Sequence, residues 1–255
     1  SIRAREWAVG VGLAIALAVL VVTSLTVGTY DLTIADITEV IGSKLGLVPV
    51  PSNEKAVTVL AVIRLPRVLI AALAGAALAV SGAAYQGIFK NPMVSPDILG
   101  VSAGAGAGAA LALLLGLSSL AVHAFSFAFG VAAVLVVMAI AGSFGKSGNA
   151  IVVMILAGTV VASVFTAVTS LLKYVADPDD TLPQITYWLM GSFARSGNET
   201  NVWAMAGSLV VGGGVLMATR WRINVMSFGD DEARAMGVNV RATRAVIIAA
   251  ATLLT

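Results

Sequence analysis

The sequence predicts an all-α, polytopic transmembrane helical bundle, and three observations carry this prediction. Of the 255 residues, 59% are hydrophobic and only 11% are charged, and the mean hydropathy is +0.99. A soluble domain carries about a quarter of its residues as Asp, Glu, Lys or Arg. The apolar residues gather in runs of about 20, the length that a helix needs to cross the hydrocarbon core. We therefore expect a single transmembrane domain over residues 1–255.

Seven apolar runs are predicted as membrane spans. They cover residues 7–27, 68–89, 98–115, 120–141, 151–172, 202–218 and 245–255, the last still apolar at its end. Residues 182–193 form a run of only about a dozen, too short to span, and are predicted as an outer half-helix. Residues 30–63 mix both charges with Pro49 and Pro51, so a short surface helix and a loop are expected there.

The basic residues predict the orientation. With the N-terminus in the cytoplasm, nine of the 15 Lys and Arg residues fall on inner segments, which are the shorter ones. Between residues 68 and 172 the only charges are Lys90, Asp97 and Lys146, and all three lie in breaks between spans. A gradient-driven secondary transporter usually keeps ionisable residues inside its spans, so this alternative is disfavoured. An intramembrane enzyme is disfavoured for the same reason.

Small residues recur at every fourth position of two spans, which places them on one helix face where a neighbouring backbone can approach. Four lie on the second span and three on the third: Gly75, Ala79, Ala83 and Gly87, then Gly100, Gly104 and Gly108. Chance is the alternative in a chain rich in Ala and Gly, so close packing is favoured more strongly for the third span. Between the two, Pro92 and Pro96 remove backbone donors and end the helix.

The segment FGDDEARAMGV, residues 228–238, predicts a short capped helix on the inner side. Its acidic residues favour the positive end of the helix, and Gly237 can close it. The acidic residues are Asp230, Asp231 and Glu232, and the apolar ones are Ala233, Met236 and Val238. The apolar residues make a docking element for a soluble partner one hypothesis, and an ordinary charged loop the other.

Arg64 and Arg67 flank Pro66 at the predicted outer end of the second span. Arginines at such positions commonly anchor a helix by placing the guanidinium at the membrane surface, and the residues alone favour this interpretation. The proline stiffens the segment, however, and guanidinium groups bind carboxylates bidentately. Docking of an acidic partner is therefore the second interpretation.

Five segments together resemble the FecCD family, the permeases of type II ABC importers for iron-siderophores, haem and cobalamin. They are RLPR at 64–67, GAALAVSGAAYQGIFKNPMVSPDILGVSAGAGAG at 75–108, LAG at 156–158, ITYWLMGSF at 185–193 and GDDEARAMGV at 229–238. The resemblance covers essentially the whole chain, in the family's order. It implies ten spans, so a chain with seven is expected to be truncated at its C-terminus. It also implies a multi-pass protein of the bacterial or archaeal cell membrane.

The resemblance implies a non-catalytic permease subunit without cofactor or metal, in which separate ATPase subunits hydrolyse ATP. The implied partners are a second permease subunit in a homodimer, two cytosolic ATP-binding subunits and a periplasmic or lipid-anchored binding protein, with no nucleic acid. The implied substrate is an iron chelate (siderophore or haem) or cobalamin. Importers of molybdate and tungstate-type oxyanions share these motifs, so an oxyanion is the alternative.

Three groups of functional residues follow from the resemblance. Arg64 and Arg67 are implied to bind glutamate side chains of the binding protein. The implied ATPase-coupling helix comprises Gly229, Asp230, Asp231, Glu232, Ala233, Arg234, Met236, Gly237 and Val238. The implied pathway and cytosolic gate comprise Gly100, Gly104, Gly108, Ser147, Gly148 and Asn149.

Overall fold

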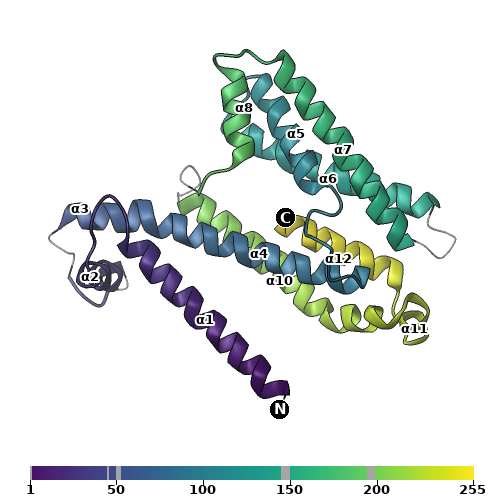
Figure 1. Ribbon diagram of the computed structural model, residues 1–255, viewed down its shortest axis with the longest axis horizontal. Helices are drawn as coiled ribbons and strands as arrows, with labels where there is room; N and C mark the ends of the chain where they lie inside the picture. The colour runs from purple at the N-terminus through teal and green to yellow at the C-terminus, as the bar shows by residue number, and fades with distance from the viewer. Residues whose placement is uncertain (1, 45, 50–52, 145–149, 194–198) are drawn as a thin grey trace. The chain divides into compact units, whose positions relative to one another are not determined.

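The computed structural model describes residues 2–44, 46–49, 53–144, 150–193 and 199–255, and these residues form helices and no strand (Figure 1). Five helices are long and apolar enough to cross a membrane. They are Ala4–Thr26, Glu54–Phe89, Ser119–Phe144, Ile151–Val175 and Glu199–Phe228. The predicted all-α membrane class is therefore confirmed.

The chain groups into two compact units. The first comprises Ser1–Ala74 and Phe193–Ala206, and the second comprises Gly75–Ser192 and Gly207–Thr255. Two long helices run from one unit into the other. They are α4 (Leu65–Phe89) and α10 (Glu199–Phe228). The single transmembrane domain expected from the sequence stays a prediction.

The first unit contains four consecutive helices: α1 (Ile2–Thr26), α2 (Ile34–Lys44), α3 (Glu54–Val57) and the π-helix η1 (Thr58–Arg64). Its core lies where the end of α1 meets α2 and η1, around Leu25, Val40 and Leu60. Most of the other apolar side chains of α1 are exposed. This exposure is what a helix in contact with lipid requires.

The second span begins earlier than the sequence predicts. Helix α2 is the short helix expected within residues 30–63, but residues 54–63 are helical and continue directly into α4, so the expected loop does not extend to residue 63. A proline inside a helix collides with the carbonyl group one turn earlier. The wider π-helical turn of η1 precedes Pro66, and Leu65 donates to the carbonyl of Leu60, five residues back. The helix therefore passes through Pro66 without a break, and Arg64 lies in its interior.

In the second unit, α5 (Val101–Leu114), α6 (Ser119–Phe144), α7 (Ala150–Val175) and α8 (Thr181–Met190) lie side by side (Figure 1). The glycines of α5 bring it close to α6. A Cβ atom on Gly104 would lie 2.6 Å from the carbonyl oxygen of Phe129, and one on Gly108 would lie 2.3 Å from that of Phe125. The close packing predicted for the third span is confirmed, because only glycine fits at this distance.

Most of the small residues predicted to pack on the second span do not pack against the described part of the chain. Gly75, Ala79 and Ala83 are exposed, and a Cβ atom on Gly75 would meet nothing within 4 Å. Of these four positions, only Gly87 has a close neighbour on α10, since a Cβ atom on it would lie 2.7 Å from Cγ2 of Ile223. The buried face of α4 instead carries Ala77, Ser81, Ala84, Tyr85 and Ile88. The prediction is therefore wrong for three of the four positions in this chain's own packing.

Three spans differ in length from their prediction. Helix α5 has 14 residues, because Ile98–Gly100 precede it as a turn and Gly100 has a positive φ of 75°. Helix α10 continues to Phe228 instead of residue 218, since the exposed Arg220 and Arg222 can extend from its sides without ending it. Helix α12 (Val240–Leu254) begins five residues early, because the side chain of Asn239 caps it by accepting from the amide of Ala242.

Candidate functional site

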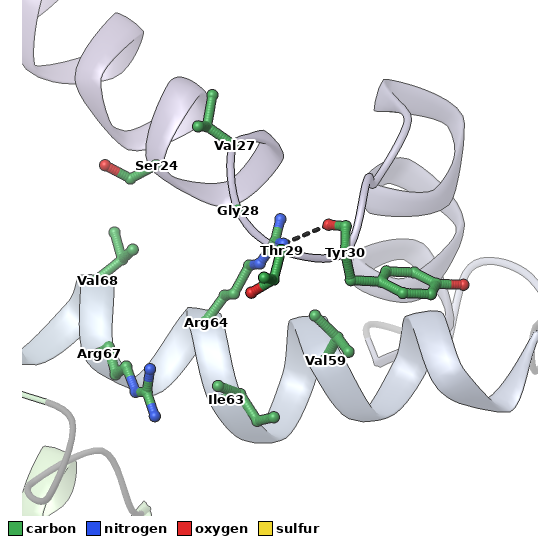
Figure 2. A pocket seen from close by; sticks show the side chains of 10 residues that line it. All are labelled: Ser24, Val27, Gly28, Thr29, Tyr30, Val59, Ile63, Arg64, Arg67 and Val68. Carbon is green, nitrogen blue, oxygen red and sulfur yellow. Dashed lines mark hydrogen bonds between the residues drawn. The ribbon is translucent and has the colours of Figure 1, made fainter.

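The first candidate site is built around Arg64. Its guanidinium donates to the carbonyl oxygens of Leu25 at 2.7 Å and Thr26 at 2.9 Å, and also to that of Tyr30 (Figure 2). The last carbonyl groups of a helix have no partner within it, and a cation at this end is favoured by the helix dipole. Arg64 therefore caps the C-terminus of α1 and fixes the connection that follows it.

A cavity of about 350 Å³ lies beside this cap, lined by both arginines together with Ser24 and Thr29. The side chain of Arg67 points away from Tyr30 (Figure 2). Arg67 is exposed and forms no hydrogen bond or ion pair with another described residue. Of the two arginines predicted to act together, Arg64 makes three hydrogen bonds within the first unit and Arg67 makes none with a described residue.

The second candidate site is α11 (Asp230–Ala235). Gly237 follows the helix with a positive φ of 80°, its amide donates to the carbonyl of Arg234, and the amide of Val238 donates to that of Ala233. These two bonds form a Schellman motif, which requires a left-handed residue and so favours glycine. The sequence predicted this closure by Gly237, and the structure confirms it.

The apolar residues of this segment do not form one exposed face. Ala233 is 0% exposed and Val238 is 6% exposed, and both belong to the core of the second unit. Met236 remains 48% exposed, and Asp231, Glu232 and Arg234 are exposed around it. The expectation that Ala233 and Val238 face a partner is wrong, because the Schellman turn directs both inward. The accessible surface of α11 is charged, with one methionine.

A half-buried ion pair links α11 to α12. The Nη2 atom of Arg244 lies 2.9 Å from Oδ1 and 3.1 Å from Oδ2 of Asp230. The side chain of Arg244 is 12% exposed and that of Asp230 is 31% exposed. Sequence reasoning missed this pair, because the two residues are 14 positions apart on different helices and no spacing rule joins them.

The residues predicted for the pathway fall into two groups. Gly100, Gly104 and Gly108 are buried, with their backbones close to α7 and α6. These contacts show a packing role, and a role in a pathway stays a prediction. Ser147, Gly148 and Asn149 lie outside the described residues. Within the described ranges, no three His, Cys, Asp or Glu side chains gather where they could hold a metal ion.

The fold and these sites define an integral membrane protein built from long apolar helices, with a short polar helix between α10 and α12. The chain belongs to the FecCD transport family, whose pattern matches residues 16–255. The molybdate import system permease protein MolB of Haemophilus influenzae is 34% identical over 237 residues, covering 93% of this chain and 69% of MolB.

Two further comparisons agree with this assignment. The cobalamin import system permease protein BtuC of Halobacterium salinarum is 33% identical over 79% of this chain, which spans 54% of BtuC. A solved, inward-facing structure of an ABC transporter described as of the metal-chelate type has a TM-score of 0.79 and 32% identity. That comparison covers 95% of this chain and 72% of the solved one. The chain thus spans between about half and three quarters of these relatives.

Proposed function

We propose that this chain is the membrane permease of an ATP-driven importer that takes an iron chelate (siderophore or haem) or cobalamin from a binding protein into the cytoplasm. The chain itself catalyses no reaction in this proposal, and two cytosolic ATPase subunits hydrolyse ATP. The observation that carries the proposal is α11, a short helix held between the apolar helices α10 and α12, together with the family match over residues 16–255.

Helix α11 has the properties that contact with a soluble ATPase requires. Its inner face is anchored in the chain's own core through Ala233, and the ion pair of Asp230 with Arg244 holds its first turn. Its outer face presents the charged residues and Met236 to the cytosol. A charged rim around an apolar anchor is a common arrangement of a docking surface. We assign the ATPase contact to this outer face of α11.

Arg67 is the proposed contact with the binding protein. Its guanidinium is exposed beside the cavity, and a carboxylate can accept two of its hydrogen bonds. Arg64 is placed in a supporting role, because its guanidinium already donates to Leu25 and Thr26 at the end of α1 and to Tyr30 in the connection that follows. The proposal therefore separates the two arginines that the sequence treats as a pair.

A second substrate class has a specific observation in its favour. MolB, which is named for molybdate import, matches this chain over 93% of its length. An oxyanion such as molybdate or tungstate is therefore the second candidate, handled by the same machinery. The two classes differ in size and charge, so binding by the partner protein separates them.

The experiment is uptake by proteoliposomes that contain the intact permease, its ATPase and its binding protein. Uptake should require ATP inside and should disappear with an ATPase variant that cannot hydrolyse it. Four substrates are compared: a ferric siderophore, haem, cobalamin and molybdate. Uptake that a proton or sodium gradient drives without nucleotide would contradict the importer proposal, and preference for molybdate would select the second candidate.

A further inference from the structure

A row of hydroxyl groups joins α4 to α12 inside the second unit. On α4, Ser81 and Tyr85 are both 0% exposed. The Oγ atom of Ser81 donates to the carbonyl oxygen of Ala251 at 3.2 Å and lies 2.9 Å from Oγ1 of Thr255. One turn further along α4, the hydroxyl of Tyr85 lies 3.4 Å from Oγ1 of Thr252.

The direction of the hydrogen bond between Tyr85 and Thr252 follows from the donors available. Thr252 donates its proton to the carbonyl of Ile248 at 2.8 Å, so its oxygen is left to accept from Tyr85. In an apolar core a hydroxyl that loses its partner stays desolvated and unpaired, which is costly. Sliding α4 along α12 by one residue would break all of these contacts together. The row therefore fixes the register of the two helices.

The other end of α12 is fixed to α11. Arg244 is the fifth residue of α12, and its guanidinium holds both carboxylate oxygens of Asp230 at the start of α11. The Nε atom of Arg244 is buried and has no partner among the described residues, and the side chain as a whole is 12% exposed, so the Asp230 carboxylate is its ion-pair partner away from water. Breaking a half-buried ion pair leaves a desolvated charge, which opposes rotation of α11 about the connection to α12.

We propose that α11, α12 and the part of α4 that follows Gly75 move as one rigid body, through which a displacement of α11 reaches α4. Asp230 and Arg244 transmit it from α11 to α12, and the hydroxyl row transmits it from α12 to α4. Arg244, Ser81, Tyr85 and Thr252 are positioning residues in this scheme. The inference rests on the proposed function, in which the ATPase moves α11.

A cross-link tests whether α4 and α12 slide during transport. The chain contains no cysteine, so Ser81→Cys with Thr255→Cys introduces one defined pair, and hydroxyls 2.9 Å apart place the two sulfurs within reach of a disulfide. In the reconstituted complex, the oxidised double variant should transport within about twofold of the same variant in its reduced form, because a bond inside a rigid body restricts no motion.

Two results would contradict the proposal that these helices move as one rigid body. One is loss of uptake on oxidation with recovery on reduction, which would show that the helices slide past each other. The other is failure of the two cysteines to cross-link in membranes, which would show that the row is not formed.

The ion pair is tested by the amount of substrate imported per ATP. Arg244→Gln should lower this ratio about tenfold while the complex still hydrolyses ATP, since coupling between sites is worth about 5–150-fold. It should also lower the melting temperature, because Asp230 is left half-buried without its partner. Arg244→Lys keeps the cation and should retain most of the coupling. Arg241→Gln removes an exposed arginine of the same helix and serves as the matched control. Equal ratios in Arg244→Gln and Arg241→Gln would show that the ion pair transmits nothing.

Failure of the proposed function gives a different result from failure of this inference. If the chain is not part of an ATP-driven importer, the wild type itself shows no ATP-dependent uptake. If only the inference fails, the wild type transports normally and the variants show the results named above. The wild-type measurement therefore comes first.

Discussion

Nη1 of Arg64 donates a hydrogen bond of 2.7 Å to the carbonyl oxygen of Leu25, 39 residues earlier in the chain. One helix therefore supplies the cap of another, and the connection between α1 and α2 is held by a side chain of η1. Arg67, one turn further on, caps no helix among the described residues. This difference gives the two arginines separate experimental signatures.

The first prediction concerns stability. Arg64→Gln should destabilise the first unit by about 2 kcal/mol, because several hydrogen bonds from a charged group to helix-end carbonyls are lost. Arg67→Gln should leave the melting temperature of the purified protein nearly unchanged. Gly28→Ala should act like Arg64→Gln, because its Cβ atom would lie 2.5 Å from Nη2 of Arg64. Equal losses for both arginine variants in a thermal melt would contradict the capping role.

The second prediction concerns docking. Arg67→Glu should weaken the complex with an acidic binding protein and make the remaining affinity less dependent on salt, since exposed ion pairs are screened. The measurement is titration of the binding protein at several salt concentrations. Lys55→Glu reverses another exposed charge of the first unit and is the control. If both variants bind equally well, Arg67 is only a membrane anchor.

The third prediction is that replacing two different glycines by alanine changes the stability of the protein in opposite directions. Gly108→Ala should destabilise the protein by about 1–3 kcal/mol, because the new methyl group overlaps the backbone of α6. Gly75→Ala should be neutral or stabilising by up to about 1 kcal/mol, because it meets nothing and lowers the entropy of the unfolded chain. Expression yield and melting temperature in detergent measure both. A stable Gly108→Ala protein would show that α5 and α6 do not pack this closely.

The fourth prediction separates the two faces of α11. Met236→Glu changes an exposed side chain, so the permease should fold and insert normally but lose its ATPase subunits during purification. Ala233→Glu places a charge in the core, so folding itself should fail. Co-purification of the ATPase and the melting temperature distinguish the outcomes. Retention of the ATPase by Met236→Glu at wild-type levels would exclude the outer face of α11 as the contact.

The fifth prediction concerns pH and the start of α2. Thr33 donates to the carboxylate of Asp36 from both its hydroxyl, at 2.6 Å, and its amide, at 2.9 Å. These bonds, the hydroxyl first, lower the pKa of Asp36 below its ordinary value. Their stabilisation is complete above the unfolded pKa of about 3.9 and is lost as the pH falls through the folded pKa.

Asp36→Asn should therefore reduce the loss of stability below about pH 4, and it should lower stability at neutral pH. Thermal melts of the wild type and of this variant across pH 2–7 make the comparison. Because the site is exposed, the effect should be small. If the difference in melting temperature between the wild type and Asp36→Asn is the same at every pH tested, the carboxylate contributes nothing to this cap.

The sequence predicts well what depends on neighbouring residues. Runs of apolar residues specify membrane helices wherever they occur, because the cost of an unpaired backbone group in lipid leaves few other structures. The end of α11 was predictable for the same reason, since Gly237 can adopt the left-handed conformation that closes the helix. Gly104 and Gly108 were recognisable because their spacing places them on one face.

The helix that contains Pro66 shows where local reasoning fails. A proline between two arginines indicates a boundary, and the structure instead continues the helix through a π-helical turn. The stripe of Gly75, Ala79 and Ala83 fails for a related reason. A periodic pattern defines a helix face, and it does not specify whether a neighbour covers that face.

The sequence alone determined that this protein is a helical membrane protein, where most of its spans lie and that a short polar helix interrupts them. Only the tertiary structure decided that Arg64 caps α1, that Ala233 faces inward and that Ser81 meets Thr255. Arg64 and Leu25 are 39 positions apart in the chain, and Ser81 and Thr255 are 174 positions apart. Such residues meet only through the way in which whole helices pack. Apolar runs and the closure of α11 by Gly237 depend on residues within one segment, whereas the partner of a side chain is chosen by the packing of the assembled core.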